Sequence, residues 1–268
     1  MRVKILIGAS LAGAAALGAI VAGFSNAQQE PAQTTDSFDA AEESAIRDIV
    51  RNYLLDNPEV LIESLNAYAA RERAASETRF KEGAKENLKA LVEDGAGFAT
   101  GADPAAATVT VIEFFDYHCS YCKRAAGLVR DLTKTDPAVK VVFRELPILR
   151  PESDYAAQVA LASRAQGKYA DLHFAMMGAT GVLTKERIKE IADGAGVDFA
   201  AIEEALLDPS INQAIDETHR IASEMAIDGT PAFIVASIDG DYIDVFPGYD
   251  PEEITASIAK AKKAAKKK

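Results

Sequence analysis

The chain has 268 residues, of which 49% are hydrophobic and 26% are charged, and its formal net charge at pH 7 is −12. This is the composition of an ordinary globular protein, and the length allows one large domain or two smaller ones. Because a strongly acidic surface is repelled by phosphate backbones, we expect no nucleic-acid partner.

The first 27 residues have the pattern of a secretory signal peptide. Arg2 and Lys4 give a positive start, an apolar run over residues 5–24 follows, and the Ser-Asn-Ala tripeptide at 25–27 is a small-x-small cleavage site. An uncleaved anchor is the alternative, because the apolar run is long, but its many Ala and Gly residues favour cleavage. We therefore predict export to the periplasm, an oxidising compartment in which cysteine pairs persist as disulfides.

A polar lead-in at 28–37 and a helical segment at 38–95 are expected next. Apolar residues recur at helical spacing from residue 46 to 68, whereas the later part is charged on most faces. Such helices are too small to build a core alone, so they either associate with other copies of the chain or cap their own domain. The first alternative makes 38–95 a helical oligomerisation segment and spacer, followed by a Gly/Ala/Pro-rich linker at 96–107.

Residues 108–268 have the alternation of an α/β domain. The stretches "TVTVIEFF" and "VKVVFREL" are rich in β-branched and aromatic residues and flank a helical stretch, which predicts a parallel β-α-β unit. A helical block follows at about 152–226, and two strands and a last helix close the chain. The order indicates a β-α-β half and a β-β-α half with a helical insertion between them.

The two cysteines of the chain, Cys119 and Cys122, form a C-x-x-C pair directly after the first of these strands. At a helix start, unpaired N–H groups and the positive helix end stabilise a thiolate, which is the attacking species in disulfide exchange. We therefore predict Cys119 as the exposed nucleophile and Cys122, one turn further, as the shielded resolving thiol. His118 can add positive charge beside the thiolate.

Two other interpretations of the cysteine pair remain open. Soft thiolates select Cu(I), so Cys119 and Cys122 could hold that ion in a two-coordinate site. A zinc site would lack ligands, because His173 and His219 lie far off in sequence and are expected to be ordinary helix residues. A purely structural disulfide is the third interpretation, in which the position at a helix start has no role.

This arrangement resembles the DsbA-like branch of the thioredoxin superfamily over about residues 105–265. The resemblance rests on "EFFDYHCSYC" between strand and helix, on the helical insertion, and on "GTPAF" before a hairpin. It implies an α/β thioredoxin fold with an inserted helical domain, preceded by an N-terminal helical segment, and no cofactor. It also implies a cis Pro231 facing the cysteines, with the backbone of Thr230 free to pair with a substrate chain.

The resemblance further implies roles for residues around the pair. Glu113 matches the family's acidic strand residue, where a buried carboxyl would have a raised pKa and could relay the proton of the inner thiol. A partly exposed glutamate is the alternative, and Glu145 is a candidate for a second relay residue. Ser120 and Tyr121 are expected to tune the thiolate, and they differ from the Pro-His of the DsbA oxidases.

The segment "IRDIVRNYLLDNPEVLIESL" resembles the N-terminal part of ScsC-like and Com1-like relatives, some of which oligomerise through it. A threonine before the cis proline is similar to the disulfide isomerases. The resemblance therefore implies a protein disulfide oxidoreductase, an isomerase or reductase if oligomeric, with a monomeric DsbA-type oxidase or a copper-tolerance protein as alternatives. Expected partners are protein thiols and disulfides, a membrane redox partner that resets the dithiol, and further copies bound through residues 38–95.

Overall fold

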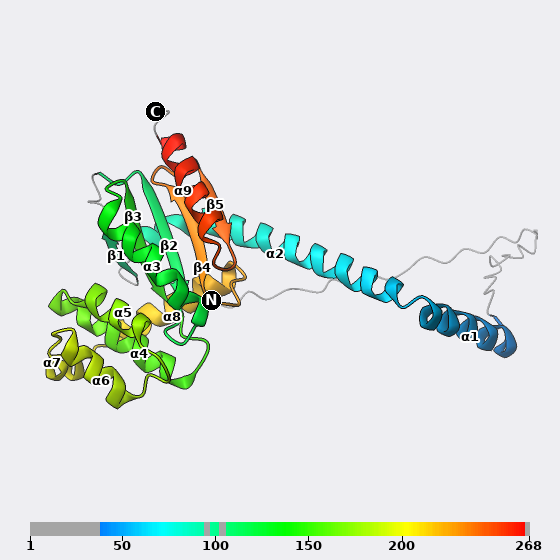
Figure 1. Cartoon of the computed structure of the whole chain (residues 1–268), viewed down its shortest axis with the longest axis horizontal. Helices are drawn as coiled ribbons and strands as arrows, with labels where there is room; N and C mark the ends of the chain where they lie inside the picture. Colours follow the sequence, from blue (N-terminus) through cyan, green and yellow to red (C-terminus); the bar gives the residue numbers. More distant parts are fainter. Residues whose placement is uncertain (1–37, 94–96, 102–105, 266–268) are drawn as a thin grey trace, which may run out of the picture. The chain divides into compact units, whose positions relative to one another are not determined.

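A computed structural model of the chain describes residues 38–93, 97–101 and 106–265 (Figure 1). The signal peptide predicted at 1–27 and the lead-in at 28–37 lie outside the described residues. The chain divides into two units, one ending at Val60 and the other beginning at Leu61. Within the described ranges, no helix combines the length and the hydropathy needed to cross a membrane.

Helix α1 (Ala40–Asp56) belongs to the first unit and exposes an apolar face. The Asp39 carboxylate caps its first turn by accepting from the backbone N–H of Glu42 at 2.8 Å, and the Glu42 side chain accepts from the N–H of Asp39 in return. No residue of α1 is buried. The exposed apolar side chains of α1 include Ile46, Ile49, Val50 and Tyr53.

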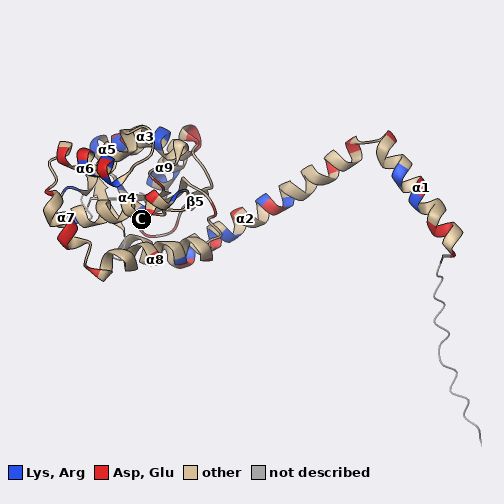
Figure 2. Cartoon of the chain, turned by 90° about the horizontal axis from the view of Figure 1, so that it is seen from below, with Lys and Arg blue, Asp and Glu red and all other residues tan. Residues whose placement is uncertain are grey.

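Helix α2 (Glu59–Glu93) begins after Pro58, and acidic and basic residues alternate along it (Figure 2). Its first turns again expose apolar side chains, namely Leu61, Ile62, Leu65 and Tyr68. The predicted helical segment at 38–95 therefore consists of two helices, and the second is one continuous helix of 35 residues.

A five-stranded mixed sheet organises the second unit, in the order β1-β3-β2-β4-β5. The strands are β1 (Phe98–Gly101), β2 (Val109–Phe115), β3 (Val139–Glu145), β4 (Ala232–Ser237) and β5 (Ile243–Phe246). Helix α3 (Ser120–Thr135) joins β2 to β3, which are parallel, and helix α9 (Pro251–Ala265) follows the antiparallel β4–β5 pair. This arrangement confirms the predicted β-α-β and β-β-α halves.

The helical insertion lies between β3 and β4. It comprises α4 (Pro151–Ala162), the 3₁₀ helix η1 (Ser163–Gln166), α5 (Tyr169–Gly178), α6 (Lys185–Gly194), α7 (Phe199–Ala205) and α8 (Pro209–Glu224). Figure 1 shows α4 to α7 gathered beside the end of the sheet, with α3 and α9 lying on one sheet face. Buried side chains of α3, α9 and the insertion share one core cluster with β2 and β3.

The second half of α2 packs on a second core cluster, as expected for the alternative in which these helices cap their own domain and unlike an exposed spacer. Phe80, Ala84 and Leu91 are buried among residues of β2, β4 and α8. The contact is close, because a Cβ at Gly83 would lie 2.7 Å from the Met225 side chain. The buried face of α2 is hard to recognise in the sequence, because its few apolar residues form one narrow stripe between charged residues.

Strand β1 lies within the stretch predicted as a linker. It pairs antiparallel with β3, and the Phe98 ring stacks on Tyr169 with their centroids 4.2 Å apart. Gly101 ends the strand with φ +100°, and a Cβ there would lie 2.7 Å from the Val139 carbonyl oxygen. A short Gly/Ala-rich edge strand has too little β-propensity to be distinguished from a linker in the sequence.

Candidate active site

Cys119 is the N-cap residue of α3, at the end of the loop that follows β2. The backbone N–H of Cys122 donates to the Cys119 sulfur at 3.3 Å. Cys119 is 5% exposed and Cys122 is fully buried beneath it. The predicted exposure of Cys119 is wrong: this residue is buried, because Thr230 from a distant loop lies against it.

The pKa values of the two thiols are shifted in opposite directions. Hydrogen bonding lowers the pKa of Cys119 from 9.0 to about 6, with the Cys122 thiol as the largest contributor and the backbone N–H groups of Cys122 and Tyr121 adding to it, against the effect of burial. Burial strongly raises the pKa of Cys122. At neutral pH, Cys119 is therefore a thiolate and Cys122 a thiol, which is the arrangement that disulfide exchange requires.

Thr230 and Pro231 face the cysteine pair from the loop before β4. The peptide bond between them is cis, and the Thr230 carbonyl oxygen lies 3.1 Å from the Cys119 sulfur. The Thr230 hydroxyl oxygen is buried, and no hydrogen-bond partner for it exists among the described residues. The backbone of Thr230 thus lies directly beside the Cys119 sulfur.

Glu113 lies in the middle of β2, opposite Phe143 of β3 and Phe233 of β4. It is 1% exposed, so the alternative of a partly exposed strand residue is wrong. Burial raises its pKa well above the ordinary value, and the negative charges of Cys119 and Glu145 raise it further. One carboxyl oxygen has no hydrogen-bond partner among the described residues, which leaves it free to accept a proton.

Glu145 lies in a buried polar cluster that the sequence does not reveal. Its carboxyl accepts from the hydroxyls of Tyr169 at 2.7 Å and Tyr117 at 3.0 Å, and burial raises its pKa to about 8. The Tyr117 hydroxyl also lies 3.2 Å from Nδ1 of His173. Burial lowers the pKa of His173 to about 3, so this ring is neutral and forms part of the core.

His118 does not supply the predicted positive charge. Its Nε2 accepts from the backbone N–H of Leu183 at 3.0 Å, so the ring proton is on Nδ1, 2.8 Å from the Ser153 hydroxyl. Burial lowers the pKa of His118, which keeps the ring neutral. The side chain instead ties the cysteine loop to two elements of the insertion.

Asp116 is a buried carboxylate that the sequence analysis missed. It accepts from the backbone N–H of His118 at 2.7 Å, from those of Ile148 and Leu149 at 2.9 Å each, and from the Ser153 hydroxyl at 2.8 Å. These bonds hold the loop before Cys119 against the loop after β3. An acidic residue three positions before a C-x-x-C pair at a strand end is the signal by which it could have been found.

Ser120 and Tyr121 are exposed at the start of α3. The Tyr121 ring lies under the Arg124 guanidinium, 3.8 Å from its centroid, and the Tyr121 backbone N–H helps to lower the pKa of Cys119. Across the described residues, no cluster of three or more His, Cys, Asp or Glu side chains is placed to hold a metal ion.

The comparison with known families decides the classification. The DSBA-like thioredoxin domain matches residues 110–259, more than half of the chain. The chain belongs to this family. The N-terminal domain of the copper resistance protein ScsC matches residues 42–75, which cover parts of α1 and α2. Both matches confirm the resemblance stated from the sequence.

Solved structures of similar proteins have the same fold. A thioredoxin-like oxidoreductase from Silicibacter pomeroyi DSS-3 is 35% identical, with a TM-score of 0.59, and the match covers 65% of this chain and 97% of that one. ScsC of Proteus mirabilis, in a transitional conformation, is 25% identical with a TM-score of 0.58, over 84% of this chain and 97% of that one.

Curated relatives match only in part. A thiol:disulfide interchange protein DsbA from Bordetella pertussis is 29% identical over 132 residues, 47% of this chain and 63% of that protein. Na(+)/H(+) antiporter NhaA 3 of Salinispora tropica is 30% identical over 134 residues, 49% of this chain. The chain spans about a fifth of the length of that antiporter, 21%.

The lowered pKa of Cys119 predicts the pH profile of thiol alkylation. In the reduced protein, the rate of Cys119 alkylation by iodoacetamide should be half-maximal near pH 6, because only the thiolate reacts. Because the folded pKa lies below the ordinary value, ionisation stabilises the reduced fold fully above about pH 9, and this stabilisation is lost as the pH falls through about 6.

The control for this profile is Cys122→Ala, which removes the largest contributor to the shift and should move the midpoint to higher pH. A midpoint near the ordinary thiol value in the unaltered protein would contradict the assignment of Cys119 as the nucleophile.

Proposed function

We propose that this chain is a protein disulfide oxidoreductase that exchanges disulfides with protein substrates through Cys119 and Cys122. The observation that carries the proposal is the contrast between a Cys119 thiolate at a helix N-terminus and a protonated, buried Cys122 beneath it. Neither a structural disulfide nor a general metal site requires one thiol with a low pKa and a second thiol with a high pKa.

The exchange follows from this asymmetry. The Cys119 thiolate attacks one sulfur of a substrate disulfide, forming a mixed disulfide and releasing one substrate thiolate. Cys122 then loses its proton and attacks the Cys119 sulfur, which releases the second substrate thiolate. The substrate gains two electrons, and the chain becomes the Cys119–Cys122 disulfide. Isomerisation results when a substrate thiolate attacks the mixed disulfide before Cys122 does.

Variants of the two cysteines test this function. Cys119→Ser should abolish exchange with a disulfide-bonded protein substrate, because no thiolate remains to attack. Cys122→Ser should allow the first attack but not the second, so the mixed disulfide should accumulate and be visible by non-reducing electrophoresis. Full exchange activity in Cys119→Ser would overturn the proposal.

We also propose that Glu113 accepts the proton of Cys122. The negative charge of Glu113 adds to the rise in the pKa of Cys122 that burial causes, the carboxyl is buried, and one of its oxygens has no hydrogen-bond partner among the described residues. A buried carboxyl with a raised pKa can exchange one proton with a neighbouring thiol: its ionised form accepts the proton of Cys122, and its protonated form returns that proton in the reverse reaction.

Glu113→Gln tests this proton transfer, since it keeps the shape of the side chain and removes its acidity. The release of substrate from the mixed disulfide should slow about tenfold to a hundredfold, in line with typical general acid–base contributions. The first attack by Cys119 should change little. An unchanged rate of release would assign Glu113 a purely structural role.

Association through the N-terminal helices forms the next part of the proposal. The apolar side chains of α1 and of the first turns of α2 are exposed in the single chain, and this region matches the ScsC N-terminal domain. Monomeric soluble proteins rarely expose a continuous apolar helix face, so we infer that other copies cover it. An assembly presents several dithiols to one substrate, which favours isomerase over oxidase activity.

Ile49→Glu tests the association, because it places a charge in the exposed apolar face of α1. The solution mass from light scattering should fall to that of a monomer, and refolding of a scrambled-disulfide protein should slow. Asn52→Glu, an exposed polar position of the same helix, is the matched control. If both variants keep the mass and the refolding rate of the unaltered protein, the proposed interface is wrong.

We propose that this exchange takes place in the periplasm. The signal peptide predicted at 1–27 would direct the chain to the periplasm, and a similar structure, 25% identical, is that of a periplasmic thioredoxin-like protein from Salmonella enterica serovar Typhimurium. A membrane redox partner would reset the dithiol there. Cu(I) binding is less favoured, because the ion requires both thiols ionised and burial opposes ionisation of Cys122.

A further inference from the structure

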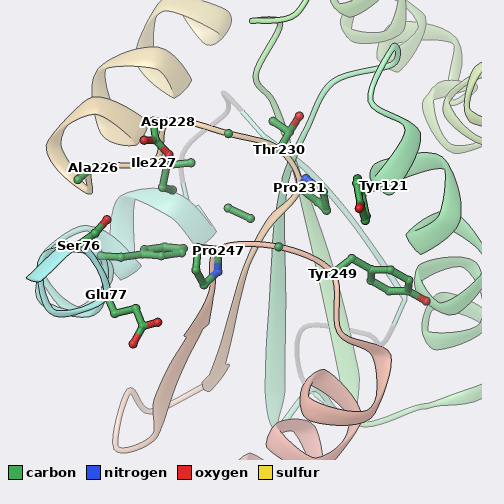
Figure 3. Close-up of a pocket in the computed structure, with 14 residues that line it drawn as sticks. Ser76, Glu77, Tyr121, Ala226, Ile227, Asp228, Thr230, Pro231, Pro247 and Tyr249 are labelled. Atoms are coloured by element: carbon green, nitrogen blue, oxygen red, sulfur yellow. The ribbon is translucent and has the colours of Figure 1, made fainter. Parts of the chain in front are cut away.

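A cavity of about 340 Å³ adjoins the cis peptide bond that faces Cys119 (Figure 3). Its lining comes from α2, from the start of α3, and from the loops that follow α8 and β5. Figure 3 shows Ser76 and Glu77 of α2 on one side, Tyr121 and Tyr249 on the other, and Pro231 between them. Helix α2 is therefore a wall of this cavity.

The cavity combines an apolar lining with carboxylates. Phe80, Pro231 and Tyr249 contribute apolar surface, and Glu77 and Asp228 are the acidic lining residues. Among the described residues, neither carboxylate has a hydrogen-bond or ion-pair partner, and the lining includes no Lys, Arg or His. Both acidic residues are exposed to solvent.

The negative charge continues into a neighbouring cavity of about 590 Å³ that shares Glu77 and Tyr249. There, Asp244, Asp250 and Glu253 line the walls together with one basic residue, Lys260. The Arg124 guanidinium, which stacks on the Tyr121 ring, is not among the lining residues of either cavity. Carboxylates outnumber basic groups along both cavities, so the region attracts cations.

The position of the first cavity relative to Cys119 defines what can occupy it. The Thr230 carbonyl oxygen lies 3.1 Å from the Cys119 sulfur, and Thr230 also lines the cavity. A substrate chain that pairs with the Thr230 backbone therefore passes both the Cys119 sulfur and the cavity. Since an extended chain advances about 3.3 Å per residue, side chains one or two positions from the substrate cysteine reach the cavity.

We propose that this cavity binds a lysine or arginine side chain located within two residues of the reacting cysteine of a substrate. The aliphatic stem packs on Phe80 and Tyr249, and the charged end lies near Glu77 and Asp228. The chain thus selects substrates with basic residues beside their cysteines, and α2 takes part in that selection. This inference rests on the proposed disulfide exchange at Cys119.

Three probe peptides test the selection. They share one sequence, carry the cysteine in a disulfide with 2-mercaptoethanol, and have Arg, Gln or Glu two residues from that cysteine. The second-order rate constants for attack by the reduced full-length protein should fall in the order Arg, Gln, Glu, with about threefold to tenfold between the extremes. The difference should shrink in 1 M salt, where the screening length is about 3 Å.

The double variant Glu77→Gln/Asp228→Asn should lose the preference for the Arg peptide. Its rate with bis(2-hydroxyethyl) disulfide, a neutral probe too small to reach the cavity, should match that of the unaltered protein. The control is Glu204→Gln/Asp216→Asn, which removes two exposed carboxylates from the insertion and should keep the preference.

The two proposals fail in different ways. Equal rates for the three peptides, or a preference that survives in the double variant, would overturn the selection while exchange with the neutral probe continues. No reaction of the unaltered, reduced protein with the neutral probe would overturn the proposed disulfide exchange, and the selection with it.

Discussion

The chemistry of this protein depends on one hydrogen-bonded sulfur at the start of α3. The thiol of Cys122 and the backbone N–H groups of the first turn converge on the Cys119 sulfur and lower its pKa to about 6, while burial keeps Cys122 protonated. Because the same helix turn supplies the donors and buries the second thiol, the asymmetry of the pair is a property of one local structure. The rest of the second unit holds this turn beside the cis bond between Thr230 and Pro231.

The loop before α3 is held by buried polar side chains. Asp116 accepts four hydrogen bonds, three from backbone N–H groups of two loops and one from the Ser153 hydroxyl of α4. His118 joins the same loop to the insertion through Leu183 and Ser153. These contacts hold the cysteine loop against the helical insertion. The neutral state of His118 leaves the hydrogen bonds at the helix start as the main cause of the acidity of Cys119.

Helix α2 packs on the sheet and also lines the cavity beside Pro231. Its buried stripe at Phe80, Ala84 and Leu91 anchors it on the sheet, and the same turns present Glu77 to the cavity beside Pro231. Its first turns carry exposed apolar residues that, together with α1, match the ScsC N-terminal domain. One helix therefore contributes to the core, to the proposed substrate cavity and to the proposed association.

The sequence by itself determined the fold class and the position of the reactive pair, because strand periodicity, the C-x-x-C spacing and "GTPAF" are local patterns along the chain. It did not determine β1, the burial of α2, the neutral state of His118, or the Asp116 and Glu145 clusters. Each of these depends on partners far away in the chain: Leu183 for His118, Ile148 for Asp116, Tyr169 for Glu145, and Met225 for α2. Burial and hydrogen bonding between distant segments set these properties, so only the tertiary structure decided them.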